Sequence, residues 1–572
     1  MASIVGKRIK GQTYYYLREV ARVGGRPKII SQRYLGKAAD IAAAIDGAAT
    51  LPARTRHLGF GALAAAWQVL AELDVPGIID RIVGARRADA ACTVGTYIAL
   101  ATANRVVAPC SKLAFADWWQ TTAGDRFLKI PTAALDHRRF WDAMDQLTPA
   151  QTATIERAVV TRMVQRFELD LQGLVVDMTN FATFIDSGND RAPIAQRGKA
   201  KQKRVDLRLV GLGLVVTRDG GVPIASHPYP GDRPDVTQFA HVVDELVVRF
   251  GELGMAPQAL TVVYDAGCDS AQNQAHLEAS GLHYVGSLRP SDHPGLLAVS
   301  ARRFQVVDAT RFPGLEAFQT HAQALGADRR VIVTHSPTFH QRQAQGFAQT
   351  LAKARRQLGE LQARLARGRT RRPRPAVEAH LARICKPRWL DRVISWELQG
   401  DRPSSLRLHW RTNQAARRRL EAEVFGKRIL FTDHDWPVAE VVAAYRAQAD
   451  VEAGFRQLKD PKVVSFSPMF HWTDQKIRVH ALYCVLALMV AHLLRRQAAQ
   501  AGIAMSVREL LATLDSIQET VMVYPSTGGR PRARRMLTDM SPTAARLSEL
   551  FGLAAYAPPR LGHTLLDPKP DP

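Results

Sequence analysis

Three acidic residues lie in contexts that suit metal-dependent chemistry. Asp177 and Asp265 each follow an apolar, strand-like segment, and Glu452 lies in a helical segment near the C-terminus. Carboxylates at the ends of neighbouring strands meet at one edge of a sheet. Three such oxygen donors suit Mg²⁺, and two ions about 3.5–4 Å apart can assist phosphoryl transfer by activating one oxygen and stabilising the other. Taken singly, each aspartate is more often a turn residue or a helix cap.

The segment 445–459 predicts a helix with a polar stripe. At about 100° per residue, the stripe contains four residues, namely Tyr445, Gln448, Glu452 and Lys459. The neighbouring face is apolar and is expected to pack into a core; it is formed by Ala444, Val451, Phe455 and Leu458. Alone, this pattern is more typical of a surface helix with solvated charges.

The stripe follows the pattern Y-x2-R-x3-E-x6-K, with Gln448 in the place of the arginine. It resembles the glutamate-bearing helix of DDE transposases from bacterial insertion sequences. The segments that begin at Asp177 and Asp265 resemble those around the two catalytic aspartates of the family. The second of these, 265–273, follows the pattern D-x-G-x-x-S-x-x-N. Segments 104–112, 197–206, 229–235 and 467–480 match further motifs in order, so the resemblance covers about residues 5–560.

The resemblance implies an RNase H-like catalytic core in which Asp177, Asp265 and Glu452 bind Mg²⁺, with Mn²⁺ as a possible substitute. It implies an enzyme that cuts DNA at the ends of its own element and joins the 3′-hydroxyl to target DNA. A homodimer is expected in the synaptic complex. Seven residues are expected to contact DNA, namely Tyr445, Gln448, Lys459, Arg197, Lys199, Lys201 and Arg204. Gln448, and Ala266 where a basic residue is common, each remove a potential phosphate contact.

Charge and length agree with a nucleic-acid-binding protein of several domains. The 572 residues carry a formal net charge of +24, which favours a polyanion as partner. A ribosome-associated or merely arginine-rich protein would have the same composition. The five scattered cysteines fit a reducing cytosol. The apolar run 481–494 is too short to span a bilayer and predicts a buried helix. We therefore expect a bacterial cytoplasmic protein, nucleoid-associated when bound to DNA, with no membrane partner.

The order β-β-β-α-β-α-β over residues 173–288, completed by the Glu452 helix, predicts an α/β fold of the RNase H-like class. An α+β insertion interrupts this core, and a small β module and a helical domain precede it. We expect a β module (1–50), followed by a helical domain that binds the end DNA (51–168). The first part of the core (169–289) is followed by an insertion domain (290–432), and the last core helices carry Glu452 (433–500). A C-terminal helical region for protomer pairing, with a tail, completes the chain (501–572).

Two other functions remain open at this stage. One is a DDE nuclease that cleaves without joining, and the other is a transposase-derived DNA-binding protein without catalysis. The three intact carboxylates disfavour the second function, whereas Gln448 keeps it open. His471 and His480 follow the glutamate helix and are expected to be structural rather than metal ligands.

Overall fold

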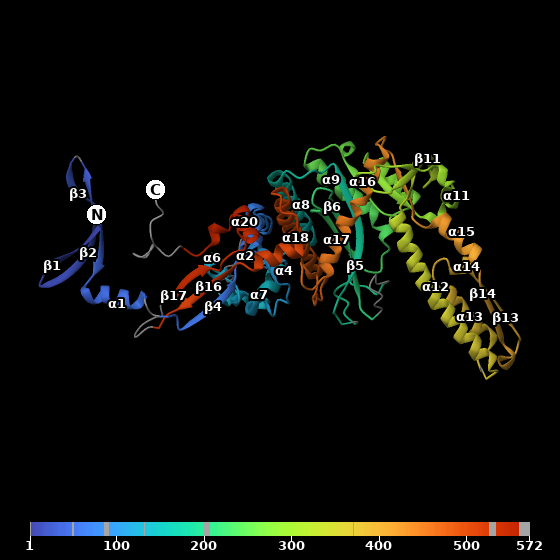
Figure 1. Cartoon of the computed structure of the whole chain (residues 1–572), viewed down its shortest axis with the longest axis horizontal. Coiled ribbons are helices and arrows are strands. Elements are labelled where there is room, and N and C mark those ends of the chain that lie inside the picture. Colours follow the sequence, from blue (N-terminus) through green and yellow to red (C-terminus); the bar gives the residue numbers. More distant parts are fainter. Residues whose placement is uncertain are drawn as a thin grey trace. The chain divides into compact units, whose positions relative to one another are not determined.

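The computed structural model describes residues 2–23, 25–48, 51–84, 91–130, 132–186, 188–198, 206–369, 371–525 and 533–559 (Figure 1). The chain divides into two compact units, each formed from segments that are distant in sequence. Unit 1 comprises residues 1–68, 117–131 and 509–572, and unit 2 comprises residues 69–116 and 132–508. Each unit is described by itself.

Unit 1 contains the predicted N-terminal β module. Strands β1 (Ala2–Ile9), β2 (Gln12–Val23) and β3 (Arg26–Gly36) form an antiparallel sheet, and helix α1 (Ala38–Ala48) follows it. Gly25 lies in the turn between β2 and β3 with φ = 78°, a backbone conformation that glycine adopts without steric cost. Strands β2 and β3 thus form a hairpin within the predicted β module.

A second sheet in unit 1 joins segments from the two ends of the chain. Strand β16 (Gln518–Val523) pairs with β4 (Arg54–Gly59) on one side and with β17 (Ala533–Leu537) on the other. The C-terminal region was expected to be helical, and this expectation is only half right. It contains α19 (Val507–Asp515) and α20 (Pro542–Leu550), but β16 and β17 lie between them. The buried Glu519 of β16 forms ion pairs with Arg126 and Arg535, which compensates its burial inside unit 1.

Unit 2 is built on a nine-stranded mixed sheet with the order β10-β11-β12-β15-β9-β8-β5-β6-β7. Strands β5, β8 and β9 are parallel to one another, and the other pairs are antiparallel. The bounds are β5 Gly173–Ala182, β6 Leu209–Thr217, β7 Pro223–Pro230, β8 Thr261–Val263, β9 His283–Leu288, β10 Gln305–Val306, β11 Glu316–Ala324, β12 Ala327–His335 and β15 Lys427–Thr432. Helices α9 (Phe239–Glu252) and α10 (Ala271–Ala279) precede β8 and β9, so the predicted order of elements is confirmed.

The predicted insertion divides into two parts. Its strands β10, β11, β12 and β15 extend the central sheet beyond β9. Its remaining elements are α12 (Pro337–Ala366), α13 (Arg374–Cys385), α14 (Leu390–Val393), α15 (Gln414–Val424) and a hairpin of β13 (Ile394–Gln399) and β14 (Arg407–Thr412). Buried leucines repeat every seven residues along α12, at 351, 358 and 365, which gives this long helix one apolar face.

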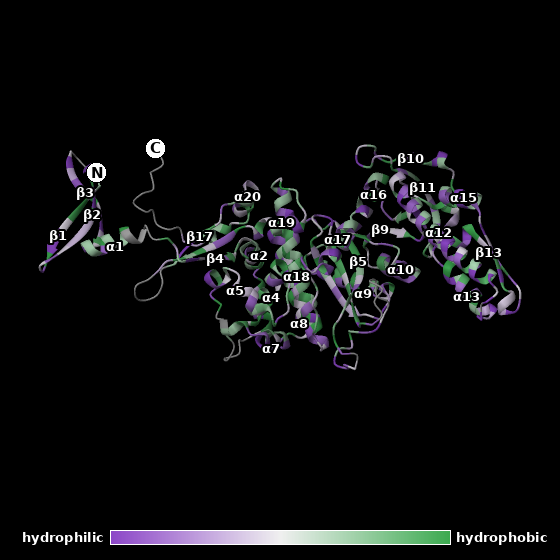
Figure 2. Ribbon diagram, turned by 60° about the horizontal axis from the view of Figure 1, so that its bottom comes forward, coloured by the Kyte–Doolittle hydropathy of each residue, from purple (hydrophilic) through white to green (hydrophobic). Residues whose placement is uncertain are grey.

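Helix α18 (Asp474–Gln500) forms the centre of the helical part of unit 2 (Figure 2). It packs against α4 (Val94–Val107), α7 (His137–Asp145) and α8 (Pro149–Phe167). Its 27 residues are long and apolar enough to cross a membrane, so the length argument from the shorter apolar run was wrong. However, 94% of its most apolar window is buried inside the protein, as predicted for a core helix. The bent pair α2 (Gly61–Glu72) and α3 (Val75–Val83) passes the same test of length and composition.

Candidate active site

The two predicted aspartates occupy equivalent positions on neighbouring parallel strands. In the ladder between β5 and β8, Val175 pairs with Val263, and each aspartate lies two residues further along the chain. Asp177 is half-buried in the middle of β5, so the prediction that this strand ends at the aspartate was wrong; the strand continues to Ala182 because it also pairs with β6 there. Asp265 is exposed in the turn after β8. The carboxylate of Asp265 accepts a hydrogen bond from the amide of Gly267 at 2.8 Å, which fixes that turn. The parallel pairing therefore brings both carboxylates to the same edge of the sheet.

A buried thiol lies close enough to both aspartates for their charges to affect it. Burial raises the pKa of the Cys268 thiol well above its usual range, and the negative charges of Asp265 and Asp177 raise it further. Burial also raises the pKa of Asp269 to about 7, with Arg289 opposing the shift and Asp265 adding to it. Charge repulsion of this kind is expected where several acidic groups share one region without a cation.

The third carboxylate is carried by α17 (Gln448–Lys459), which packs against β5 (Figure 1). Gln448 is buried, and its amide nitrogen donates to the carbonyls of Val176 at 3.4 Å and Val263 at 3.2 Å. One side chain thus connects α17 to the strands of both aspartates. Glu452 follows one helical turn later, with 61% of its side chain exposed and Arg456 at 3.6 Å. The helix therefore carries an accessible carboxylate beside the edge where Asp177 and Asp265 lie.

The predicted continuous stripe is interrupted before α17. Tyr445 belongs to a separate helix, α16 (Val438–Arg446). This helix ends with a 3₁₀-type turn, in which the amide of Ala447 donates to the carbonyl of Ala444. The Tyr445 ring is buried, and its hydroxyl bonds to Ser287 at 3.1 Å and accepts from Arg428 at 3.2 Å. Ser287 Oγ in turn accepts from the amide of Ala266, next to Asp265. The structure therefore connects Tyr445 to the second aspartate through Ser287.

Lys459 also contacts the protein. Its ammonium donates to Thr179 Oγ at 2.6 Å and lies 5.5 Å from the centre of the Phe181 ring. Thr179 is two residues after Asp177 on β5, so Lys459 fixes the C-terminal end of α17 to the strand of the first aspartate. The predicted apolar face of the segment, at positions 444, 451, 455 and 458, is buried as expected.

A cavity of about 350 Å³ adjoins Glu452, and its basic lining was not predicted. Arg342, Arg428 and Arg446 line it together with Tyr445, Gln448 and Glu452. The three arginines come from α12, β15 and α16, which are distant in sequence. In a chain with 77 lysines and arginines, no local pattern distinguishes these three. Their shared position follows only from the pairing of β12 with β15 and from the turn into α16.

The basic segment after β5 is described only in part. Arg197 is exposed and follows Gln196, which forms an isolated bridge with Leu209. Lys199, Lys201 and Arg204 lie outside the described residues.

The two histidines after α17 are buried, their rings lie against each other, and His480 is hydrogen-bonded. Burial lowers the pKa of His471 to about 3 and that of His480 well below its usual range, so both are neutral. His480 Nε2 bonds to the Phe466 carbonyl at 2.7 Å, and its Nδ1 bonds to Tyr483 at 2.6 Å. Arg105 donates to the carbonyls of residues 465 and 467 and so holds the same loop. These contacts agree with the predicted structural role.

The donor set suits Mg²⁺, which binds few carboxylates and completes its octahedron with water and phosphate oxygens. Among the residues that the structure describes, Asp177, Asp265 and Glu452 do not gather with all their donor atoms within 4.8 Å of one another. An open arrangement is expected for three carboxylates without a cation, because like charges repel. All three side chains reach solvent at least partly, so a cation and its water ligands have access to them.

The profile of the family "Transposase DDE domain" matches residues 169–488, which is more than half of the chain. The chain belongs to this transposase family. The match begins just before β5 and ends within α18, so all three carboxylates of this transposase lie inside the family domain. No curated protein matches the chain. A cryo-EM structure of the piggyBac transposase synaptic complex with hairpin DNA is similar, with a TM-score of 0.36, 10% identity, and coverage of 81% of this chain and 82% of that one.

Proposed function

We propose that the protein binds the ends of its own insertion sequence, cleaves DNA there and joins the 3′-hydroxyl to target DNA by metal-dependent phosphoryl transfer. The observation that carries this proposal is the shared register of Asp177 and Asp265, with α17 connected to both strands through Gln448. The order β7-β6-β5-β8-β9, a meander followed by two parallel strands, supports an RNase H-like core.

In this proposal Asp177, Asp265 and Glu452 hold Mg²⁺, for which Mn²⁺ can substitute. Bound ions would lower the barrier by activating the attacking oxygen and stabilising the leaving oxygen. Gln448 and Lys459 hold α17 against β5, so that Glu452 keeps a fixed position relative to the aspartates. The reaction requires no protein nucleophile, because water and then a DNA hydroxyl attack phosphorus.

The basic cavity beside Glu452 provides groups for the DNA backbone. Arginine guanidinium groups donate paired hydrogen bonds to phosphate oxygens, and Arg342, Arg428 and Arg446 line this cavity. The exposed Arg197 would add a salt-sensitive contact. Tyr445, Gln448 and Lys459 then serve DNA chemistry mainly by positioning the site. Two protomers would pair in the synaptic complex, because both element ends must be held together for joining.

The test uses the purified protein and the terminal DNA that flanks its gene. We expect Asp177→Asn, Asp265→Asn and Glu452→Gln each to abolish cleavage and joining in Mg²⁺ while end binding persists. The folding of Glu452→Gln should be nearly unaffected, because the exposed Glu452–Arg456 pair contributes at most about 0.5 kcal/mol. Glu378→Gln is the matched control, since Glu378 also forms an exposed i,i+4 pair, with Arg374 in α13.

The outcomes separate the rival functions. Cleavage and joining by the parent, lost in all three variants, supports a transposase. Cleavage without joining by the parent indicates a DDE nuclease, and end binding without either reaction indicates a DNA-binding descendant. A folded Glu452→Gln protein that cleaves at the parental rate contradicts the assignment of the third carboxylate.

A further inference from the structure

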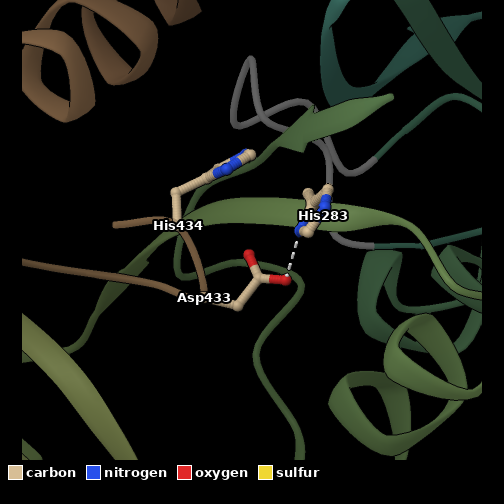
Figure 3. Close-up of side chains that lie close together, drawn as sticks. All are labelled: His283, Asp433 and His434. Atoms are coloured by element: carbon tan, nitrogen blue, oxygen red, sulfur yellow. Dashed lines mark hydrogen bonds and ion pairs between the residues drawn. The ribbon is translucent and has the colours of Figure 1, made fainter. Parts of the chain in front are cut away.

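A second group of metal-type donors lies at the other edge of the central sheet. His283 begins β9, and Asp433 and His434 directly follow β15 (Figure 3). Because β9 and β15 are antiparallel partners, with Val285 opposite Thr432, the start of one strand meets the end of the other. In the part of the chain that the structure describes, these three residues alone form a group of at least three His, Cys, Asp or Glu residues with all donor atoms within 4.8 Å of one another.

This group is separate from the proposed active site. It borders a cavity of about 630 Å³ whose lining includes Gly173 of β5 and Thr261 of β8. These residues begin the two parallel strands, whereas Asp177 lies further along β5 and Asp265 follows the end of β8. Four residues separate Gly173 from Asp177, which corresponds to about 13 Å along a strand. The two groups of donors therefore lie at opposite edges of one sheet.

The side chains are already oriented by hydrogen bonds. His283 Nδ1 lies 2.8 Å from Asp433 Oδ2, and Asp433 Oδ1 accepts from the amide of Tyr284 at 2.9 Å. His434 Nε2 lies 2.8 Å from the hydroxyl of Thr261. That contact leaves Nδ1 of His434 for a metal, and an outer hydrogen bond of this kind fixes the ring of a metal-binding imidazole.

We propose that His283, Asp433 and His434 bind one divalent transition-metal ion of the Zn²⁺ class. Two imidazoles and one carboxylate match the ligands that Zn²⁺ prefers, whereas Mg²⁺ prefers oxygen ligands only. Donors around a tetrahedral Zn²⁺ lie about 3.3 Å apart for metal–ligand distances of 2.0–2.1 Å. The donor atoms now lie within 4.8 Å of one another, so binding requires them to approach more closely. The cavity leaves a fourth position for water or another small ligand.

The ion would anchor the chain where it returns from the insertion. Asp433 and His434 lie between β15 and α16, and α16 leads directly into the helix that carries Glu452. A bound ion would connect this segment to the first residue of β9. The proposal does not depend on the DNA reaction, since it concerns binding at residues that do not include the three carboxylates.

The experiment uses the full-length protein, stripped of metal with a chelator and then dialysed. Zn²⁺ binding is measured by titration calorimetry in the presence of excess Mg²⁺. In a separate sample, the absorbance spectrum of bound Co²⁺ reports the geometry and type of the metal ligands. We expect one equivalent of Zn²⁺ to bind and to raise Tm up to a 1:1 ratio. Because loss of an outer hydrogen bond typically weakens metal binding by about 10–100-fold, loss of the ligand in His434→Ala should weaken it by more than about 100-fold.

Asp433→Asn is a second variant, which keeps an oxygen for the Tyr284 amide and removes the charge. It should weaken binding strongly while preserving the circular dichroism spectrum. His321→Ala is the matched control, since His321 forms an exposed pair with Asp328 at 3.3 Å in the hairpin of β11 and β12. Equal Zn²⁺ affinity for the parent, His434→Ala and Asp433→Asn would overturn the proposal.

Discussion

Gln448 offers a sharp test of how the proposed site is built. A substitution to Leu keeps the size and apolar body of the side chain but removes both hydrogen bonds to Val176 and Val263. A typical hydrogen bond contributes about 0.5–1.5 kcal/mol net, so the loss of two should cost about 1–3 kcal/mol. At about 2.1 cal/mol/K per residue, a cooperative unit of about 400 residues should lose roughly 1–4 °C in Tm.

The effect on activity should exceed the effect on stability. Gln448 is one helical turn before Glu452, and it connects α17 to the strands of both aspartates. Its loss lets the first turn of α17 move, and misplacement of a reacting group by about 1 Å costs on the order of 100-fold in rate. We therefore expect Gln448→Leu to bind end DNA normally and to cleave it much more slowly. Gel shift and single-turnover cleavage measure the two properties separately.

The same helix supplies the control. Gln457 is also in α17, but its side chain contacts His492 of α18 at 2.9 Å. Gln457→Leu should lower Tm to a similar or smaller extent and should leave cleavage close to parental. If Gln448→Leu cleaves at the parental rate with unchanged Tm, the two hydrogen bonds from Gln448 to the strands contribute nothing to stability or cleavage. Equal losses of cleavage in both variants would mean that α17 matters only as a whole.

Two further predictions concern groups next to Asp265. Tyr445→Phe keeps the ring but removes the hydroxyl that bonds to Ser287, so we expect slower cleavage and normal end binding; parental cleavage would instead fit a stacking role for the ring. Asp269, with a pKa raised to about 7 by burial, holds a proton in the folded protein over a range where the unfolded chain has lost it. In EDTA, the free energy of unfolding should therefore fall as the pH rises from about 4 to 7, by up to about 1.4 kcal/mol per pH unit. Asp269→Asn should remove this pH dependence from denaturation curves. A slope that persists in Asp269→Asn would assign it to another group.

The parts of the fold that could be predicted from the sequence have a local cause. The predicted order of elements begins at residue 173 and ends at 288, and β5 and β9 respectively begin and end there, because an apolar run between turn signals specifies a buried strand. The two aspartates could be selected because each follows an apolar run, although β5 continues past Asp177. In contrast, β16 and β17 are short strands beside helical segments, and the second partner of β16 is β4, more than 450 residues away. Pairing at that distance leaves no periodic signal in either segment.

The residues around the carboxylates were harder to predict because sequence spacing gives the face of a helix but not what that face contacts. The pattern placed Tyr445, Gln448 and Lys459 on an exposed polar stripe that would meet DNA. The turn at Ala447 and the packing of α17 on β5 instead direct these polar groups to Ser287, to strand carbonyls and to Thr179.

Polar groups on such a helix can satisfy the ends of strands as well as they can bind phosphate. Val176 and Val263 lie just before the aspartates, and a buried carbonyl there needs a donor. Gln448 supplies that donor, and the arginine of the usual pattern also has several N–H groups. The change from Arg to Gln at this position is therefore compatible with an intact site, because positioning requires only N–H groups directed at two carbonyls. Gln448→Arg should accordingly keep the connection of α17 to both strands.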